Sequence, residues 1–166
     1  DRLLATGPQR LDDRLGQVVD PERRRADAVA HLEQPGENAV DTKSNTLATR
    51  ATMVIRNTVA YGFRGGLITN MAAFNLKENV AVTVDRVTVY DSEIAFRLRG
   101  PAPAAKGAWV TVKNAVVYDT QTAFRYENNI EQLRVWNSTL GRGIGQPFHA
   151  ASSSATGIDV RNLLVL

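Results

Sequence analysis

The chain has 166 residues, of which 43% are hydrophobic and none is cysteine, so one domain with a sizeable core is expected and disulfide or thiolate chemistry is excluded. No stretch approaches the roughly 18 to 20 apolar residues that span a membrane, so no membrane partner is expected. The net charge of +3 fits weak attraction to polyanions, but the blocks of Lys and Arg typical of nucleic-acid binders are missing.

The first 36 residues have apolar positions at helical spacing and no strand alternation. Asp20-Pro21-Glu22 is typical of a helix start, with Asp as the cap, Pro in the first helical position and Glu in the first turn. We therefore predict that residues 1–36 form a helical cap over the open end of a second region, residues 37–166.

A five-residue phrase recurs through the second region, and each copy alternates apolar and polar residues with period two, as a β-strand does. Such self-similarity marks units that must stack to bury a continuous core. We predict an all-β solenoid of about four to five coils with parallel sheets. The copies are M-V-I-R-N at 53–57, V-T-V-D-R at 82–86, V-T-V-K-N at 110–114, L-R-V-W-N at 133–137 and I-D-V-R-N at 158–162.

A second strand is predicted in each coil, at 37–43, 65–70, 94–99, 122–127 and 146–150. One apolar column faces inward, and two rows face outward. The inward column is Val40, Leu67, Phe96, Phe124 and Phe148. The outward rows are Asp41, Ile68, Arg97, Arg125 and His149, and, two residues on, Lys43, Asn70, Arg99, Glu127 and Ala151.

Two ladders of identical residues are expected where the first strands bend and end. Asparagine tolerates left-handed backbone angles and can bond the next coil about 4.8 Å away, and tyrosine rings at this spacing can stack. We interpret both ladders as structural. Their members are Asn57, Asn114, Asn137 and Asn162, and Tyr61, Tyr90 and Tyr118.

The outward rows of the second strand predict a groove that crosses successive coils. Arginine binds carboxylates in bidentate fashion, so Arg97, Arg99 and Arg125 suit an extended acidic polymer. The alternative is that these arginines only pair with neighbouring carboxylates. Trp136, which also points outward, is expected either to stack on a sugar ring or to shield the sheet.

The V-x-V-x-N strands, the ladders and the coil length resemble the right-handed parallel β-helix superfamily of pectate lyases, polygalacturonases and alginate or chondroitin lyases, over about residues 37–166. The resemblance implies a right-handed, single-stranded parallel β-helix. It also implies a secreted or cell-surface protein that binds, and as a lyase cleaves, an acidic polysaccharide.

Residues 37–44, E-N-A-V-D-T-K-S, resemble the stretch that carries the catalytic lysine of the alginate and chondroitin lyases. That resemblance implies β-elimination with Lys43 as base and Arg64, about one coil later, as acid. It also implies calcium as a cofactor, with Glu37 and Asp41 as its ligands. A salt bridge between Asp41 and Lys43 is the direct competitor to catalysis.

Two other functions stay open. A non-catalytic carbohydrate-binding or surface-adhesion β-helix needs only the arginine ladder. A polygalacturonase-type hydrolase needs clustered carboxylates; Asp91 and Asp119 share a column, but they are ordinary corner residues. Because the chain ends in mid-coil at N-L-L-V-L, we also expect further coils or a partner chain to cover its last strand.

Overall fold

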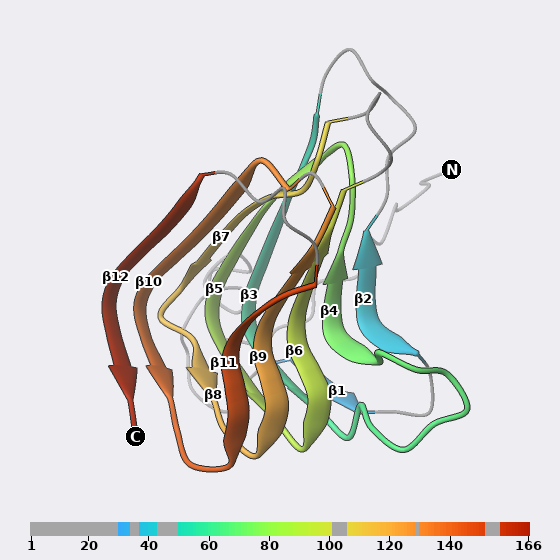
Figure 1. Cartoon of the computed structure of the whole chain (residues 1–166), viewed down its shortest axis with the longest axis vertical. Helices are drawn as coiled ribbons and strands as arrows, with labels where there is room; N and C mark the ends of the chain where they lie inside the picture. Colours follow the sequence, from blue (N-terminus) through green and yellow to red (C-terminus); the bar gives the residue numbers. More distant parts are fainter. Residues whose placement is uncertain (1–29, 34–36, 43–49, 101–105, 129, 152–156) are drawn as a thin grey trace, which may run out of the picture.

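The computed structural model describes residues 30–33, 37–42, 50–100, 106–128, 130–151 and 157–166. Every regular element in this part of the chain is a β-strand, and the strands stack into a solenoid of about four turns (Figure 1). All strand pairs among the described residues are parallel, which confirms the predicted parallel solenoid. Its right-handed sense stays a prediction. No helix that could cross a membrane is found among the described residues.

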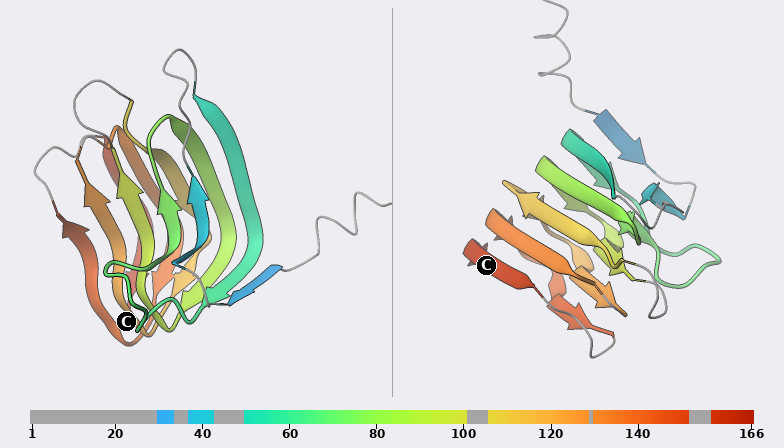
Figure 2. Two further views of the ribbon diagram at one scale, coloured as in Figure 1. Left: turned by 90° about the vertical axis from the view of Figure 1, so that its right-hand side faces the viewer. Right: turned by 90° about the horizontal axis from the view of Figure 1, so that it is seen from above.

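Two sheets form the faces of the solenoid (Figure 2). Sheet A contains, in spatial order, β1 (Ala30–Glu33), β3 (Ala51–Tyr61), β5 (Val80–Tyr90), β7 (Trp109–Lys113) with β8 (Val116–Val117), β10 (Gln132–Leu140) and β12 (Ile158–Val165). Sheet B contains β2 (Asn38–Thr42), β4 (Ala72–Leu76), β6 (Ser92–Arg99), β9 (Thr120–Glu127) and β11 (Ile144–Ala150).

The predicted register of sheet A is confirmed. The third residue of each phrase stacks on its neighbours as expected, since Ile55 pairs with Val84 and Val84 pairs with Val112. Val84 and Val112 are completely buried. Period-two alternation therefore places β-branched side chains inside, where they fit the pleated surface of parallel strands.

The asparagine column marks a bend in the strands of sheet A. Asn57, Asn114, Asn137 and Asn162 all have φ between 49° and 54°, and Arg86 takes the same left-handed conformation in its coil. Side-chain hydrogen bonds link the coils at this bend, as from Asn162 Nδ2 to Asn137 Oδ1 at 2.9 Å and from Arg86 Nε to Asn57 Oδ1 at 2.8 Å. The ladder is therefore structural, as predicted.

Aromatic stacks run along the solenoid. The rings of Tyr61 and Tyr90 lie 5.0 Å apart and those of Tyr90 and Tyr118 5.1 Å apart, all nearly parallel, which confirms the tyrosine ladder. A second stack fills the inside of sheet B, with ring centroids 5.1–5.2 Å apart. Its members are Phe74, Phe96, Phe124 and Phe148.

The predicted strand at 65–70 is wrong. Phe74 of β4 occupies the column that was expected to hold Leu67, while Leu67 and Ile68 are exposed. Between β3 and β4 the chain bonds to β6 at two places: the carbonyl of Phe63 accepts from Glu93 N at 2.8 Å, and the carbonyl of Met71 accepts from Ile94 N at 3.1 Å. The residues between these two bonds, 64–70, form an insertion that we call the inserted loop.

The helical prediction for the N-terminal segment is wrong at Ala30–Glu33, which forms strand β1. Residues 1–29, including the expected helix start, lie outside the described residues. β1 pairs in parallel with the second half of β3, and Tyr61 Oη donates to Glu33 at 2.9 Å. Pairing with the open edge of β3 supplies backbone hydrogen bonds that a helix at this place would leave unmade.

The last coil is less covered than the middle coils. Ile158 and Val160 of β12 are both 42% exposed, although their neighbours in the same columns, Leu133 and Val135, are completely buried. The chain ends next to β12, at one end of the stack (Figure 1). Coverage of β12 by further coils or a partner chain stays a prediction.

Candidate functional site

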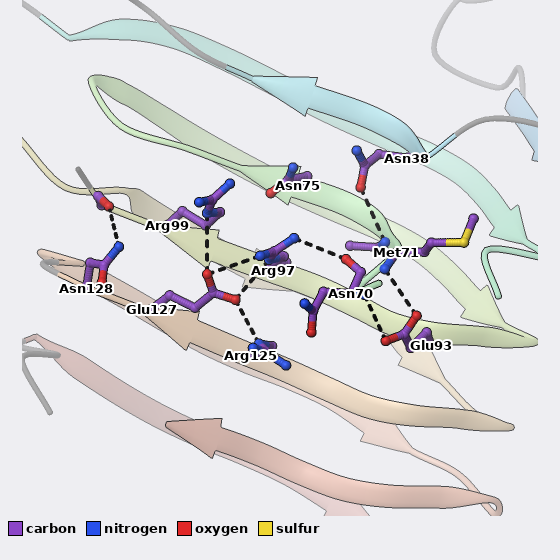
Figure 3. A network of polar contacts seen from close by, with 12 residues as sticks. Asn38, Asn70, Met71, Asn75, Glu93, Arg97, Arg99, Arg125, Glu127 and Asn128 are labelled. Carbon is purple, nitrogen blue, oxygen red and sulfur yellow. Dashed lines mark hydrogen bonds and ion pairs between the residues drawn. The ribbon is translucent and has the colours of Figure 1, made fainter. Parts of the chain in front are cut away.

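Three arginines surround one carboxylate on the outer face of sheet B (Figure 3). Arg97 binds Glu127 in bidentate fashion, with Nε to Oε1 at 2.9 Å and Nη2 to Oε2 at 3.2 Å. Arg125 Nε donates to Oε1 at 2.8 Å, and Arg99 Nε lies 3.4 Å from Oε2. We call these four residues the arginine cluster. β6 supplies Arg97 and Arg99, and β9 supplies Arg125 and Glu127.

The arginine cluster keeps a positive charge after its internal pairing. Three guanidinium groups and one carboxylate sum to a net charge of +2. Burial works to raise the pKa of Glu127, but the hydrogen bonds and charges of Arg97 and Arg125 outweigh it and hold the pKa below its usual value of 4.5. Glu127 is therefore ionised at neutral pH, and the surplus positive charge is available to an anionic ligand.

A hollow of about 200 Å³ lies beside the cluster, between the inserted loop and the strands β2, β4 and β6. We call it the loop pocket. Its charged lining is mainly cationic, with Lys77, Arg97 and Arg99 against one carboxylate, Glu37. The remaining lining residues are Asn38, Ile68, Thr69, Asn70, Met71 and Asn75.

Hydrogen bonds fix the return of the inserted loop against sheet B (Figure 3). The carboxylate of Glu93 accepts from Asn70 N at 3.0 Å and from Met71 N at 3.2 Å. Arg97 Nη1 donates to the carbonyl of Asn70 at 3.2 Å, and Met71 is buried. The loop therefore forms a fixed wall of the pocket, and Arg97 joins that wall to the arginine cluster.

The side of the loop pocket toward β2 holds an amide and ion-pair network. Asp41 Oδ2 accepts from Lys77 Nζ at 2.7 Å and from Asn75 Nδ2 at 3.2 Å. Asn75 is 4% exposed, and its Oδ1 has no hydrogen-bond partner. Asp41 thus has Lys77 as its ion-pair partner. Lys43, the partner that sequence reasoning weighed, lies outside the described residues.

The structure brings together part of the predicted site. Asn70, Arg97, Arg99, Arg125 and Glu127 meet at the cluster and the loop pocket. His149 pairs in register with Arg125, one strand further along the outer face. Glu37 lines the loop pocket, and Asp41 lies in the network at its edge.

Trp136 is not brought to this face. It lies on β10 of sheet A, where the guanidinium groups of Arg134 and Arg161 sit 5.4 and 5.6 Å from its ring centre. Its indole Nε1 donates to Asp159 at 3.3 Å, and a hydrogen bond from Arg161 lowers the pKa of Asp159. Trp136 therefore has its own set of partners on the other sheet.

Arg64 lies in the inserted loop and forms an ion pair with Asp91. It borders a larger hollow of about 430 Å³, whose lining also includes Glu93 and Asp119. Two carboxylates and one already paired guanidinium make this hollow a poor site for an anion. The smaller loop pocket is therefore the better candidate, although it has less than half the volume.

The predicted calcium ligands do not form a calcium site by themselves. Calcium takes six to eight oxygen ligands, whereas Asp41 Oδ2 is already occupied by Lys77 and Asn75. Within the ranges that the structure describes, no group of three or more His, Asp or Glu residues could hold a metal ion. Calcium as a cofactor stays a prediction.

Sequence reasoning missed Asn75 and Lys77, because it placed the strand of this coil in the inserted loop. A signal for the correct register was present in a short motif. A-F-N-L at 73–76 matches A-F-R-L at 95–98 and A-F-R-Y at 123–126. Aligning the phenylalanines places Asn75 beside Arg97 and Arg125, as the strand pairing shows.

Comparison of the chain with protein-family models, curated proteins and solved structures finds no match.

Proposed function

We propose that the protein binds an acidic polysaccharide across the outer face of sheet B. The observation that carries this proposal is the arginine cluster, in which three guanidinium groups share the single carboxylate of Glu127. Charged hydrogen bonds to carboxylates are the interaction that arginine forms best. A carboxylated or sulfated sugar polymer supplies such groups in series.

The spacing of the strands supports a polymer as the ligand. Arg97, Arg125 and His149 occupy one register column on β6, β9 and β11, and neighbouring strands lie about 4.8 Å apart. Polar groups therefore repeat at right angles to the strands. A polymer that crosses β6, β9 and β11 would meet one of these three side chains at each coil.

The narrower form of the proposal is cleavage by β-elimination within a right-handed, pectate lyase-like β-helix. Crossovers between parallel strands of one sheet are right-handed in nearly all proteins, which supports the sense of winding. The resemblance around Lys43 and Arg64 supports the chemistry, in which Lys43 removes the proton α to a uronate carboxylate and Arg64 protonates the departing oxygen. A secreted or cell-surface location accompanies this proposal.

The test is a binding panel with the full chain. Polygalacturonate, alginate and chondroitin sulfate are titrated by calorimetry at low and high salt, beside neutral dextran. We expect at least one acidic polymer to bind, with affinity that falls as salt rises, and dextran not to bind. Equal binding of dextran, or no binding of any acidic polymer at low salt, would contradict the proposal.

The same mixtures decide between binding and cleavage. Ultraviolet absorbance of unsaturated uronates is followed with and without calcium, for the wild type and for Lys43→Ala. A rise that disappears in Lys43→Ala supports β-elimination with Lys43 as base. Binding without any rise in absorbance rejects the lyase and leaves the carbohydrate-binding module.

A further inference from the structure

The loop pocket contains a buried hydrogen-bond acceptor without a partner. Asn75 is 4% exposed and lines the pocket, and its Nδ2 is used by Asp41 while its Oδ1 accepts nothing. Buried polar atoms without partners are rare in folded proteins, because each costs the full desolvation penalty of its group. Such an atom in a pocket wall points to a ligand that carries a hydroxyl or N–H donor.

Two cationic groups beside Asn75 have unused donors. Lys77 Nζ has three N–H bonds and donates to Asp41 at 2.7 Å. Arg99 Nε is buried but makes no hydrogen bond, since its 3.4 Å contact with Glu127 has poor geometry. One acceptor next to two cations matches a small unit that bears both a hydroxyl group and an anionic group.

The size and walls of the pocket restrict it to one such unit. Pockets for drug-sized ligands have volumes of about 300–1,000 Å³, whereas this one has about 200 Å³. Residues 68–71 form its wall on one side, and Glu37 and Asn38 line it at β2. The carboxylate of Glu37 would repel a further acidic sugar in that direction, whereas Arg125 and His149 continue the row in the opposite direction.

We propose that the loop pocket receives the terminal acidic sugar of a polysaccharide. Asn75 Oδ1 accepts a hydrogen bond from a ring hydroxyl, Lys77 and Arg99 bind the carboxylate, and the rest of the polymer extends over Arg125. This inference rests on the proposed function and adds that the protein recognises chain ends. The polymer binds with one end fixed against the inserted loop.

The first test counts binding sites on polygalacturonate of known chain length, with the wild-type protein. The same mass of polymer is titrated before and after partial hydrolysis. We expect the amount of bound protein at saturation to follow the number of chain ends. Saturation that follows the total mass of sugar would overturn end recognition, even if the polymer binds well.

The second test uses Asn75→Leu, which removes the unpartnered acceptor and the amide donor to Asp41 at nearly constant size, and Gln121→Leu as a control. Gln121 is an exposed amide on the same face, in β9, outside the lining of the loop pocket. We expect Asn75→Leu to weaken galacturonate binding about fivefold to tenfold and the control to leave it unchanged. Galactose, which lacks the carboxylate, is expected to bind much more weakly.

Inorganic phosphate serves as the probe for a simple anion site. If phosphate binds as tightly as galacturonate and Asn75→Leu changes neither affinity, the pocket does not recognise a sugar. Polymer binding that follows mass and is insensitive to Asn75 rejects the end site but leaves the proposed function. Absence of binding to every acidic polymer rejects both.

Discussion

The two faces of sheet B are built from the same strands but hold opposite kinds of side chain. The inner face holds the phenylalanine stack, in which Phe74, Phe96 and Phe124 are completely buried. The outer face holds the arginine cluster, in which Arg99 is 38% exposed and Glu127 is surrounded by cations. Alternation along β6 and β9 therefore places the buried core and the proposed binding surface at neighbouring positions.

The difference shows why the outer face is the functional candidate. Stacked rings remove apolar surface from water and need no ligand to do so. Three guanidinium groups around one carboxylate leave a surplus charge that the fold does not neutralise within the cluster. One arginine would be enough to pair with Glu127 if the cluster only stabilised the fold. The surplus positive charge is what binding of an anion would use.

The largest expected effect is the loss of stability when the phenylalanine stack on the inner face is disrupted. Phe96→Ala removes the ring between Phe74 and Phe124, and we expect the free energy of unfolding to fall by about 3–5 kcal/mol. Urea denaturation followed by circular dichroism measures this loss. Under conditions where the variant stays folded, polymer affinity should change little, and a selective loss of binding would contradict the separation of the faces.

A middle-sized effect is expected from Glu127→Gln, which leaves three guanidinium groups without a counter-charge. We expect a loss of about 2 kcal/mol in the free energy of unfolding. At neutral pH the variant should bind polyanions more tightly than the wild type, because the cluster gains one unit of positive charge. Unchanged stability would show that Glu127 is not the centre of the cluster.

The pH dependence of stability tests the same residue. The pKa of Glu127 is lowered in the fold, so between the lowered value and about 4.5 the unfolded chain binds more protons than the folded chain. Stability from Glu127 is complete above about pH 4.5 and is lost as pH falls through the lowered pKa. Glu127→Gln should remove that part of the acid destabilisation; an identical pH profile would contradict the assignment.

Much of the fold could be predicted from the repeated phrase. The columns through Val84 and Val112 and the tyrosine ladder needed only period-two alternation and a constant register. The inserted loop could not be found in this way, because Leu67 and Ile68 have the composition of a strand and nothing in their alternation reveals that they are exposed. The strand at Ala30–Glu33 was also not predictable from its own sequence, because its pairing with β3 is a tertiary contact that overrides the local helical spacing of apolar residues.

The candidate site was predictable where it lies on regular strands and not elsewhere. Arg97, Arg99, Arg125 and Glu127 follow from strand register. Asn75 and Lys77 depend on where the inserted loop ends, and Trp136 was assigned to the site only because it points outward. A side chain predicted to point outward can lie on either sheet, because both sheets of the solenoid have an outer face.

The most direct measurement compares two double variants in one titration with the acidic polymer that binds best. Arg99→Gln/Arg125→Gln changes the outer face of sheet B, and Arg134→Gln/Arg161→Gln changes the surroundings of Trp136 on sheet A; each lowers the net charge from +3 to +1. We predict that the first pair weakens binding at least tenfold and that the second changes it less than twofold. Equal losses would show attraction to overall charge alone, and a larger loss from the second pair would place binding on sheet A; either result would contradict the proposed binding face.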